Sequence, residues 1–162
     1  MPEFTQKYAI VQFLKDVPDG YEYPMNNWPI HVTLVDVFAI NAEWGDLFDN
    51  LRVSLATQTA FFSTVVVKDL FGEERSIKVN LLENTKELQN LHDEIVNTLE
   101  KYGVQFNSPQ YTRTGFKPHS TEHIEGSLVI GDIVEFSSIA LVDMFPNDDP
   151  YRRRILGTIH LA

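Results

Sequence analysis

The chain contains no cysteine, which excludes disulfide bonds, thiolate nucleophiles and cysteine-ligated zinc. It also lacks an apolar run of roughly 20 residues, the length needed to cross a bilayer. Its first residues lack the basic stretch and long apolar segment of a secretory signal. With 162 residues, 43% of them hydrophobic, and no low-complexity tract, we expect one ordered domain over 1–162. The expected location is the cytoplasm, without membrane contact.

Basic residues are scarce as well. Lys and Arg number 13 against 23 Asp and Glu, so the formal net charge is -10. Binding to duplex DNA depends on neutralising many phosphates, so this balance argues against it. A small anionic ligand in a local pocket remains compatible with the sequence. The basic side chains concentrate in 151–154, "YRRR", and around Arg113 and Lys117.

The hydrophobic pattern alternates between strands and helices. A helical stripe begins at Trp44 with Asn41 as the expected N-cap, and a second begins after Asn84 or Thr85 and ends at Gly103. The predicted strands cover 8–14, 31–40, 61–70, 75–82, 119–124, 133–145 and 153–161, with a hairpin turn over 71–74. This order predicts an α+β fold with helices packed on mainly antiparallel sheet. Since each half carries one helix, we hypothesise a bilobal chain with two sheets and a central groove.

One three-residue pattern occurs twice, about half a chain apart. "WPIHVTL" contains His31 and Thr33, and "FKPHSTEH" contains His119 and Thr121. Each copy opens a predicted strand shortly after a proline. Alternation along a strand places the histidine and threonine of each copy on one face. In the first copy it places Asp36 on the opposite face.

Two facing His-x-Thr strands would supply two imidazoles and two hydroxyls around one point. A phosphate needs several hydrogen-bond donors, and cleavage of a phosphodiester needs a base and an acid. Histidine suits both proton-transfer roles near neutral pH, without a metal or a cofactor. The alternative is that either histidine is a hydrogen-bonded core residue.

The two motifs, "HVTL" and "GFKPHST", resemble those of the 2H phosphoesterase superfamily, in particular the 2'-5' RNA ligase-like or RNA 2',3'-cyclic phosphodiesterase branch. The resemblance implies a bilobal fold in which His31 and His119 are the catalytic pair and Thr33 and Thr121 bind phosphate. It implies metal-free opening of a 2',3'-cyclic phosphate to a 2'-phosphomonoester, with His119 as base and His31 as acid, and ligation as the reverse reaction. The fourth motif position is usually apolar, so Glu122 departs from the pattern. Strand alternation predicts that it points away from the groove.

The expected ligand is a nucleotide or an RNA end with a cyclic phosphate. The alternative function is a non-catalytic domain that binds RNA ends or nucleotides. The candidate groove residues are Trp28, Arg113, Phe116, Lys117, Tyr151 and Arg154, as aromatic stacking partners or phosphate-binding cations. Tyr111 is a further stacking candidate. Each of these side chains has an ordinary packing or surface role as its alternative.

The remaining histidines receive structural interpretations. His123 shares strand parity with His119, and we favour a surface position for it over the far end of the groove. Zinc bound by His31, His119 and His123 is conceivable, but the spacing gives it no specific support. His92 is expected on the solvated flank of the second helix.

Overall fold

The computed structural model describes residues 6–72, 74–123 and 126–162. Its strands are β1 (Gln6–Phe13), β2 (Glu22–Pro24), β3 (His31–Ile40), β4 (Phe61–Phe71), β5 (Ile77–Leu82), β6 (Gln105–Phe106), β7 (His119–Thr121), β8 (Ile133–Phe136), β9 (Ser138–Asp143) and β10 (Arg152–His160). The helices are α1 (Trp44–Ser54) and α2 (Lys86–Glu100), with 3-10 turns η1 (Pro109–Tyr111), η2 (Arg113–Gly115) and η3 (Pro146–Asp148). Glu73 of the predicted turn and Ile124 of the predicted strand lie outside the described residues.

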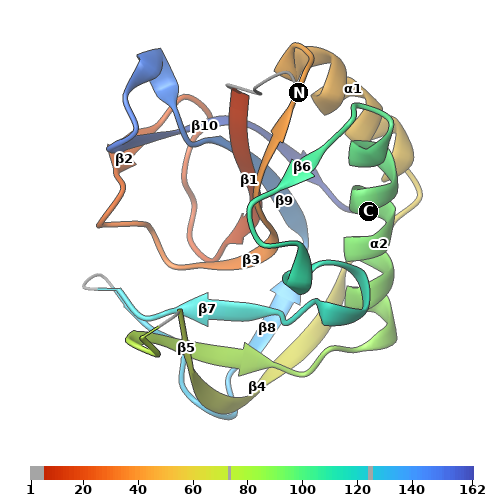
Figure 1. The fold of residues 1–162 in the computed structure, drawn as a ribbon. Helices are drawn as coiled ribbons and strands as arrows, with labels where there is room; N and C mark the ends of the chain where they lie inside the picture. The colour runs from red at the N-terminus through yellow and green to blue at the C-terminus, as the bar shows by residue number, and fades with distance from the viewer. Residues whose placement is uncertain (1–5, 73, 124–125) are drawn as a thin grey trace.

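The predicted α+β class is confirmed, with two helices and mostly antiparallel strand pairs. The prediction of two sheets is wrong. The strands form one ten-stranded sheet in the order β2-β10-β9-β1-β3-β7-β5-β4-β8, with β6 paired to β3. Its upper and lower groups of strands in Figure 1 are joined where β3 meets β7, through the single register pair Thr33 and His119.

The predicted strand 133–145 is broken into β8 and β9, because the two parts pair with different strands. β8 pairs with β4, whereas β9 pairs with β1 and β10. The buried side chain of Gln12 holds the break in place. Its Oε1 accepts hydrogen bonds from the backbone N–H groups of Ser137 (2.7 Å) and Ser138 (2.9 Å), and its Nε2 donates to the Glu135 carbonyl.

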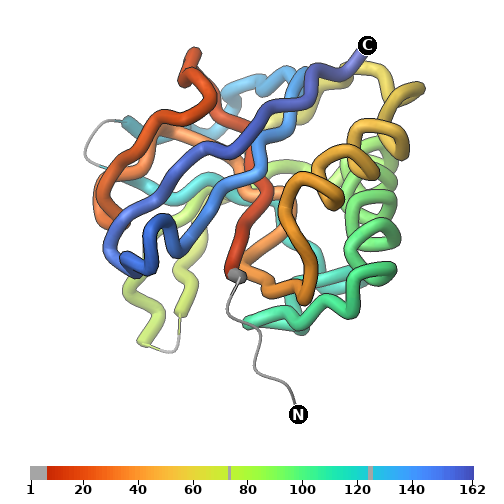
Figure 2. The backbone as a smooth tube through the Cα atoms, turned by 90° about the horizontal axis from the view of Figure 1, so that it is seen from above, coloured from red at the N-terminus to blue at the C-terminus, as the bar shows by residue number. Residues whose placement is uncertain are grey.

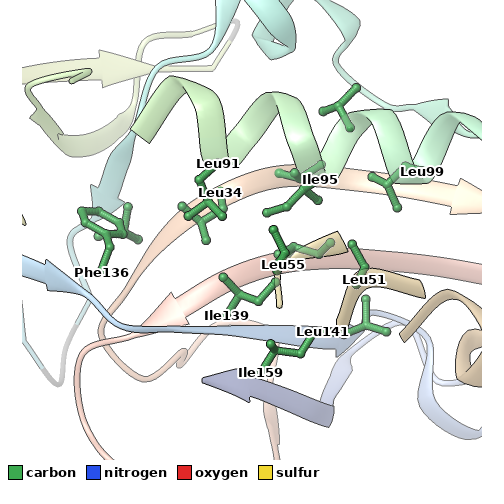
Figure 3. Packing of buried hydrophobic residues seen from close by; sticks show 14 of the residues in the cluster. Leu34, Leu51, Leu55, Leu91, Ile95, Leu99, Phe136, Ile139, Leu141 and Ile159 are labelled. Carbon is green, nitrogen blue, oxygen red and sulfur yellow. The ribbon is translucent and has the colours of Figure 1, made fainter. Parts of the chain in front are cut away.

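Both helices cover the same side of the sheet, as seen from above in Figure 2. Leu91, Ile95 and Leu99 of α2 project toward Leu34 and toward Leu51 of α1 in the core shown in Figure 3. The even-numbered motif residue Leu34 is therefore fixed by apolar packing, and Thr33 beside it faces the other way. None of the helices in the described ranges is long and apolar enough to span a membrane.

The helix ends differ in part from their predictions. Thr85 caps α2, since its Oγ1 accepts a hydrogen bond from the Leu88 N–H at 3.2 Å. Gly103 follows this helix with φ of +63°, as a helix-ending glycine does. The predicted cap at Asn41 is wrong, because α1 begins after Glu43, whose side chain makes no capping hydrogen bond. The short strands β2 and β6 were not predicted, since three and two residues carry no periodicity.

Candidate active site

A cavity of about 700 Å³ lies where β3 meets β7. His31 and Thr33 of the first motif line it together with His119 and Thr121 of the second. The two motifs are direct neighbours in the sheet, because Thr33 and His119 form the register pair between their strands. We call this space the motif cavity.

The two motif histidines are anchored in the same way. His31 Nδ1 lies 2.8 Å from the Pro29 carbonyl oxygen, and His119 Nδ1 lies 2.8 Å from that of Lys117. Each partner is the carbonyl two residues earlier in the chain. A carbonyl only accepts, so this hydrogen bond assigns the proton of the neutral ring to Nδ1. In both rings Nε2 is then free to accept a proton.

The rings have different neighbours. His31 is 6% exposed and packs against Trp28, at 4.6 Å between ring centroids, and His123, at 5.7 Å and 29° between planes. His119 is half-buried, and the Phe71 ring meets it at 4.8 Å and 60°. Aromatic walls thus hold each imidazole plane.

The pKa of His31 is lowered to about 4, mainly by burial and to a lesser extent by the neighbouring rings of His123 and His119, against the opposing effect of the hydrogen bond to Pro29. Burial also lowers the pKa of His119, although the Lys117 carbonyl and the Asp36 carboxylate oppose this shift. Both rings are therefore neutral near pH 7 in the free protein. A bound phosphate would favour their charged forms, because a nearby negative charge raises a histidine pKa.

His123 is not the surface residue that we favoured. It lines the motif cavity together with His119 and Thr121, and it stacks on His31. Its Nε2 is buried and has no hydrogen-bond partner within the described residues. Burial lowers the pKa of this ring too. The regions 6–72, 74–123 and 126–162 contain no group of three or more metal-ligating side chains, so they give the zinc alternative no support.

The prediction of a solvated His92 is also wrong, because this ring has no exposed surface. Its Nδ1 lies 2.7 Å from the Leu34 carbonyl oxygen, and its Nε2 accepts a hydrogen bond from the Arg113 N–H at 3.0 Å. The Phe116 ring stacks on it at 4.0 Å and 8°. His92 therefore ties α2 to the first motif and to the loop that precedes the second. Burial lowers its pKa, which keeps the ring neutral, as these two hydrogen bonds require.

Asp36 lies in the cavity lining, although strand alternation predicted the opposite face. The pairing of β1 with β3 shifts register between Tyr8 and Ile10 and again between Ile10 and Val11. At these bulges β3 has extra residues, so alternation fails beyond Thr33. Sequence reasoning also missed the polar lining residues Asn107, Ser108 and Gln110, which no motif marks.

Three of the predicted groove side chains line the motif cavity, namely Trp28, Phe116 and Lys117. Among the lining residues of the described chain, Lys117 is the only Lys or Arg. Tyr111, the further stacking candidate, is also part of the lining.

The other three groove candidates lie elsewhere. Arg113 pairs with Glu100 on α2, at 2.7 Å from its Nη2 to the carboxylate, and Arg154 pairs with Glu22 at 2.6 Å. Tyr151 is 70% exposed. Glu122 also points away from the motif cavity, as alternation predicted, and its carboxylate lies 3.7 Å from Lys68 Nζ. The departure at the fourth motif position leaves the cavity face of the second motif intact.

Comparisons with known proteins place the fold. No protein-family model and no curated protein sequence matches the chain. Solved structures do match over nearly the whole length of both chains. A crystal structure of a phosphoesterase is 18% identical, with a TM-score of 0.57, over 97% of this chain and 98% of the other.

Two further matches are named proteins. E. coli LigT complexed with 3'-AMP is 15% identical, with a TM-score of 0.61, over 97% of this chain and 98% of that one. TT0787 of Thermus thermophilus is 16% identical, with a TM-score of 0.60, over 96% and 97%. At these identities the likeness shows the fold alone: the chain shares the fold of these three proteins, which agrees with the resemblance that the two motifs carry.

Proposed function

We propose that the chain is a phosphoesterase that opens 2',3'-cyclic phosphates, at RNA ends or on small nucleotides, to 2'-phosphomonoesters without a metal. The observation that carries the proposal is the pairing of Thr33 with His119, which brings both His-x-Thr motifs to one cavity. The strand groups on either side of this pair act as two lobes around a substrate groove. LigT, which shares the fold, has been crystallised with 3'-AMP, ATP and NADP+, and this supports a nucleotide ligand.

The chemistry needs one proton on the histidine pair. The base accepts a proton from the attacking water, and the acid donates one to the leaving 3'-oxygen as its bond to phosphorus breaks. We assign His119 as base and His31 as acid. Thr33 and Thr121 donate hydrogen bonds to the phosphate oxygens, whose negative charge in turn stabilises the charged acid.

Ligation is the reverse of this reaction, with an RNA 5'-hydroxyl in place of water. The net charge of -10 makes a long RNA chain a poorer substrate than a short end or a free nucleotide. The same charge argues against duplex DNA as a partner. The cytoplasm remains the predicted compartment.

The test is turnover of a panel of nucleoside 2',3'-cyclic phosphates and cyclic-phosphate-ended oligonucleotides in the presence of excess EDTA. Chromatography against 2'- and 3'-phosphate standards identifies the product. We expect the 2'-phosphomonoester, at a rate that EDTA does not change. Loss of activity in EDTA, restored by zinc or magnesium, contradicts the metal-free mechanism. Binding of the cyclic phosphate without turnover supports a non-catalytic nucleotide-binding domain.

A further inference from the structure

The end of the motif cavity beside His119 has an aromatic wall. Phe71 and Tyr111 stack with their ring centroids 5.5 Å apart and their planes at 11°. The Phe71 ring also meets the edge of His119. Both aromatic side chains are half-buried and line the cavity, so part of their surface is open to a ligand. Flat aromatic side chains of this kind bind unstacked bases.

The polar groups of this end form a second wall. Asn107, Ser108 and Gln110 come from the segment that leads into Tyr111. The Asn107 N–H donates a hydrogen bond to the Val37 carbonyl at 3.0 Å, which ties this segment to β3 directly beside Asp36. The aromatic wall and the polar wall are therefore parts of one site that begins at His119.

Asp36 supplies the only carboxylate of the lining within the described chain. Its Oδ1 accepts a hydrogen bond from the Val37 N–H at 2.8 Å, and no described Lys or Arg lies within ion-pair distance of it. An ionised carboxylate only accepts hydrogen bonds, with room for about four across its two oxygens. After the Val37 bond, most of this capacity is left for a ligand with donor groups.

Nucleobases differ in the donors that they present. Guanine carries N1–H and the N2 amino group side by side, which matches a two-oxygen acceptor. Adenine and cytosine place a ring acceptor beside their amino group, and uracil places carbonyl oxygens on both sides of its N–H. A bidentate side-chain contact to a base discriminates by roughly 1–3 kcal/mol, a factor of about 5 to 150. We propose, building on the function proposed above, that this end of the cavity is a nucleobase subsite in which Asp36 selects guanine.

The experiment compares wild type with Asp36→Asn on the four nucleoside 2',3'-cyclic phosphates. In wild type we expect kcat/KM for the guanosine substrate to exceed that for uridine by roughly tenfold or more. The variant should lose this ratio, because the amide presents one acceptor and one donor. Asp69→Asn is the matched control. Asp69 Oδ1 accepts the N–H of the next residue, Leu70, at the same 2.8 Å, but lies outside the motif cavity.

Several outcomes overturn the proposal. One is that wild type shows no preference for the guanosine substrate. Another is that Asp36→Asn lowers kcat/KM equally for all four substrates, which would show that Asp36 acts only through its charge on His119. Binding separates this proposal from the proposed function. If no cyclic nucleotide is turned over, calorimetric titration with 2'-GMP and 2'-UMP still tests the subsite. Tighter binding of 2'-GMP that Asp36→Asn abolishes supports it, and equal affinities contradict it.

Discussion

The two His-x-Thr motifs have the same local geometry, but different parts of the structure hold them in position. The first lies at the start of β3, a ten-residue strand paired with β1, β6 and β7. The second lies on β7, a strand of three residues between β3 and β5. Long strand pairing thus fixes His31, whereas the short β7 gives His119 little support of its own.

The loop before β7 supplies the support for His119 that the short strand lacks. His92 holds the loop through the Arg113 N–H and the face of Phe116. A Cβ on Gly115 would lie 1.8 Å from the Gln110 carbonyl oxygen, so the loop closes in a way that only glycine permits. The comparison teaches that equivalent catalytic geometry can depend on sheet pairing in one half-site and on loop anchors in the other.

The strongest test of equivalence removes each motif histidine. We expect His31→Ala and His119→Ala each to reduce kcat by roughly 10²- to 10⁴-fold, the usual contribution of a positioned general acid or base. Steady-state kinetics on a cyclic nucleotide measures the loss. His160→Ala serves as the control, because this histidine is exposed at the end of β10. Normal turnover by both motif variants would rule out the two-histidine mechanism.

Removal of His92 should separate the two half-sites. His92→Ala leaves the Leu34 carbonyl and the Arg113 N–H without their partner and opens a void against Phe116. We expect a loss of about 3–5 kcal/mol in the free energy of unfolding, measured by urea denaturation.

Below the unfolding midpoint, amide hydrogen exchange of this variant should rise in the loop before β7 and stay unchanged in β3. Equal increases in both segments would show that His92 supports the whole core and not the second motif in particular.

Replacement of the motif threonines tests their part in phosphate binding. Thr33→Val and Thr121→Val each remove one donor and leave proton transfer intact. A hydrogen bond to a charged group contributes about 1.5–3 kcal/mol, so we expect roughly tenfold or greater losses in kcat/KM, smaller than those of the histidine variants. If either threonine variant falls as far as a histidine variant, that hydroxyl has a role beyond phosphate binding.

His123 makes the two half-sites unequal, because it follows the second motif and the first motif has no corresponding histidine. Its ring packs on His31 without a hydrogen bond between them. We expect His123→Asn to reduce kcat/KM only a few-fold, since aromatic pairs contribute about 0.5–1.5 kcal/mol. A loss above roughly 10²-fold would place His123 among the proton-transfer groups.

The pH profile tests the shared proton. The productive enzyme holds one proton on the pair, so kcat/KM falls at low pH when both rings are charged and at high pH when both are neutral. Burial lowers both pKa values, to about 4 for His31. The bell-shaped profile of kcat/KM, which reports the free enzyme, should therefore centre below about 6.5, the ordinary histidine value.

The profile of kcat should lie at higher pH, because the bound anion raises both pKa values. The acidic and alkaline limbs of each profile report pKa values of the coupled histidine pair and not of single residues. An optimum of kcat/KM well above pH 7 would contradict the effect of burial. The histidine variants then test the assignment of base and acid, since each should lose one limb.

Much of the site could be predicted because each motif lies at the start of a strand, where the alternation of side chains can be read directly from the sequence. Alternation alone placed Glu122 away from the cavity and Thr33 beside His31 on one face. Asp36 could not be placed in this way, since the bulges of β3 arise from its pairing with β1 and have no signature in β3 itself.

Other positions depended on contacts distant in the chain. His92 flanks an apolar stripe, and its burial follows from the loop that folds over it. The side chain of Arg113 forms an ion pair with Glu100 on α2 and does not line the cavity. No spacing in the sequence indicates either contact.

The sheet order has a consequence for how the protein acquires activity during synthesis. β4, β5, β7 and β8 come from one continuous stretch, 61–136, and can pair among themselves as soon as that stretch is available. β3, which carries His31, also finds its partners β1, β6 and β7 before β9 emerges. The other edge of β1 waits for β9, since Tyr8 pairs with Asp143, and β9 in turn pairs with β10. Because chains emerge from the ribosome N-terminus first, the part of the sheet behind β1, including Met144 of the cavity lining, is completed last. The motif cavity should therefore be complete only after β9 and β10 have emerged, so a nascent chain stalled before them would carry both motifs in paired strands and remain inactive.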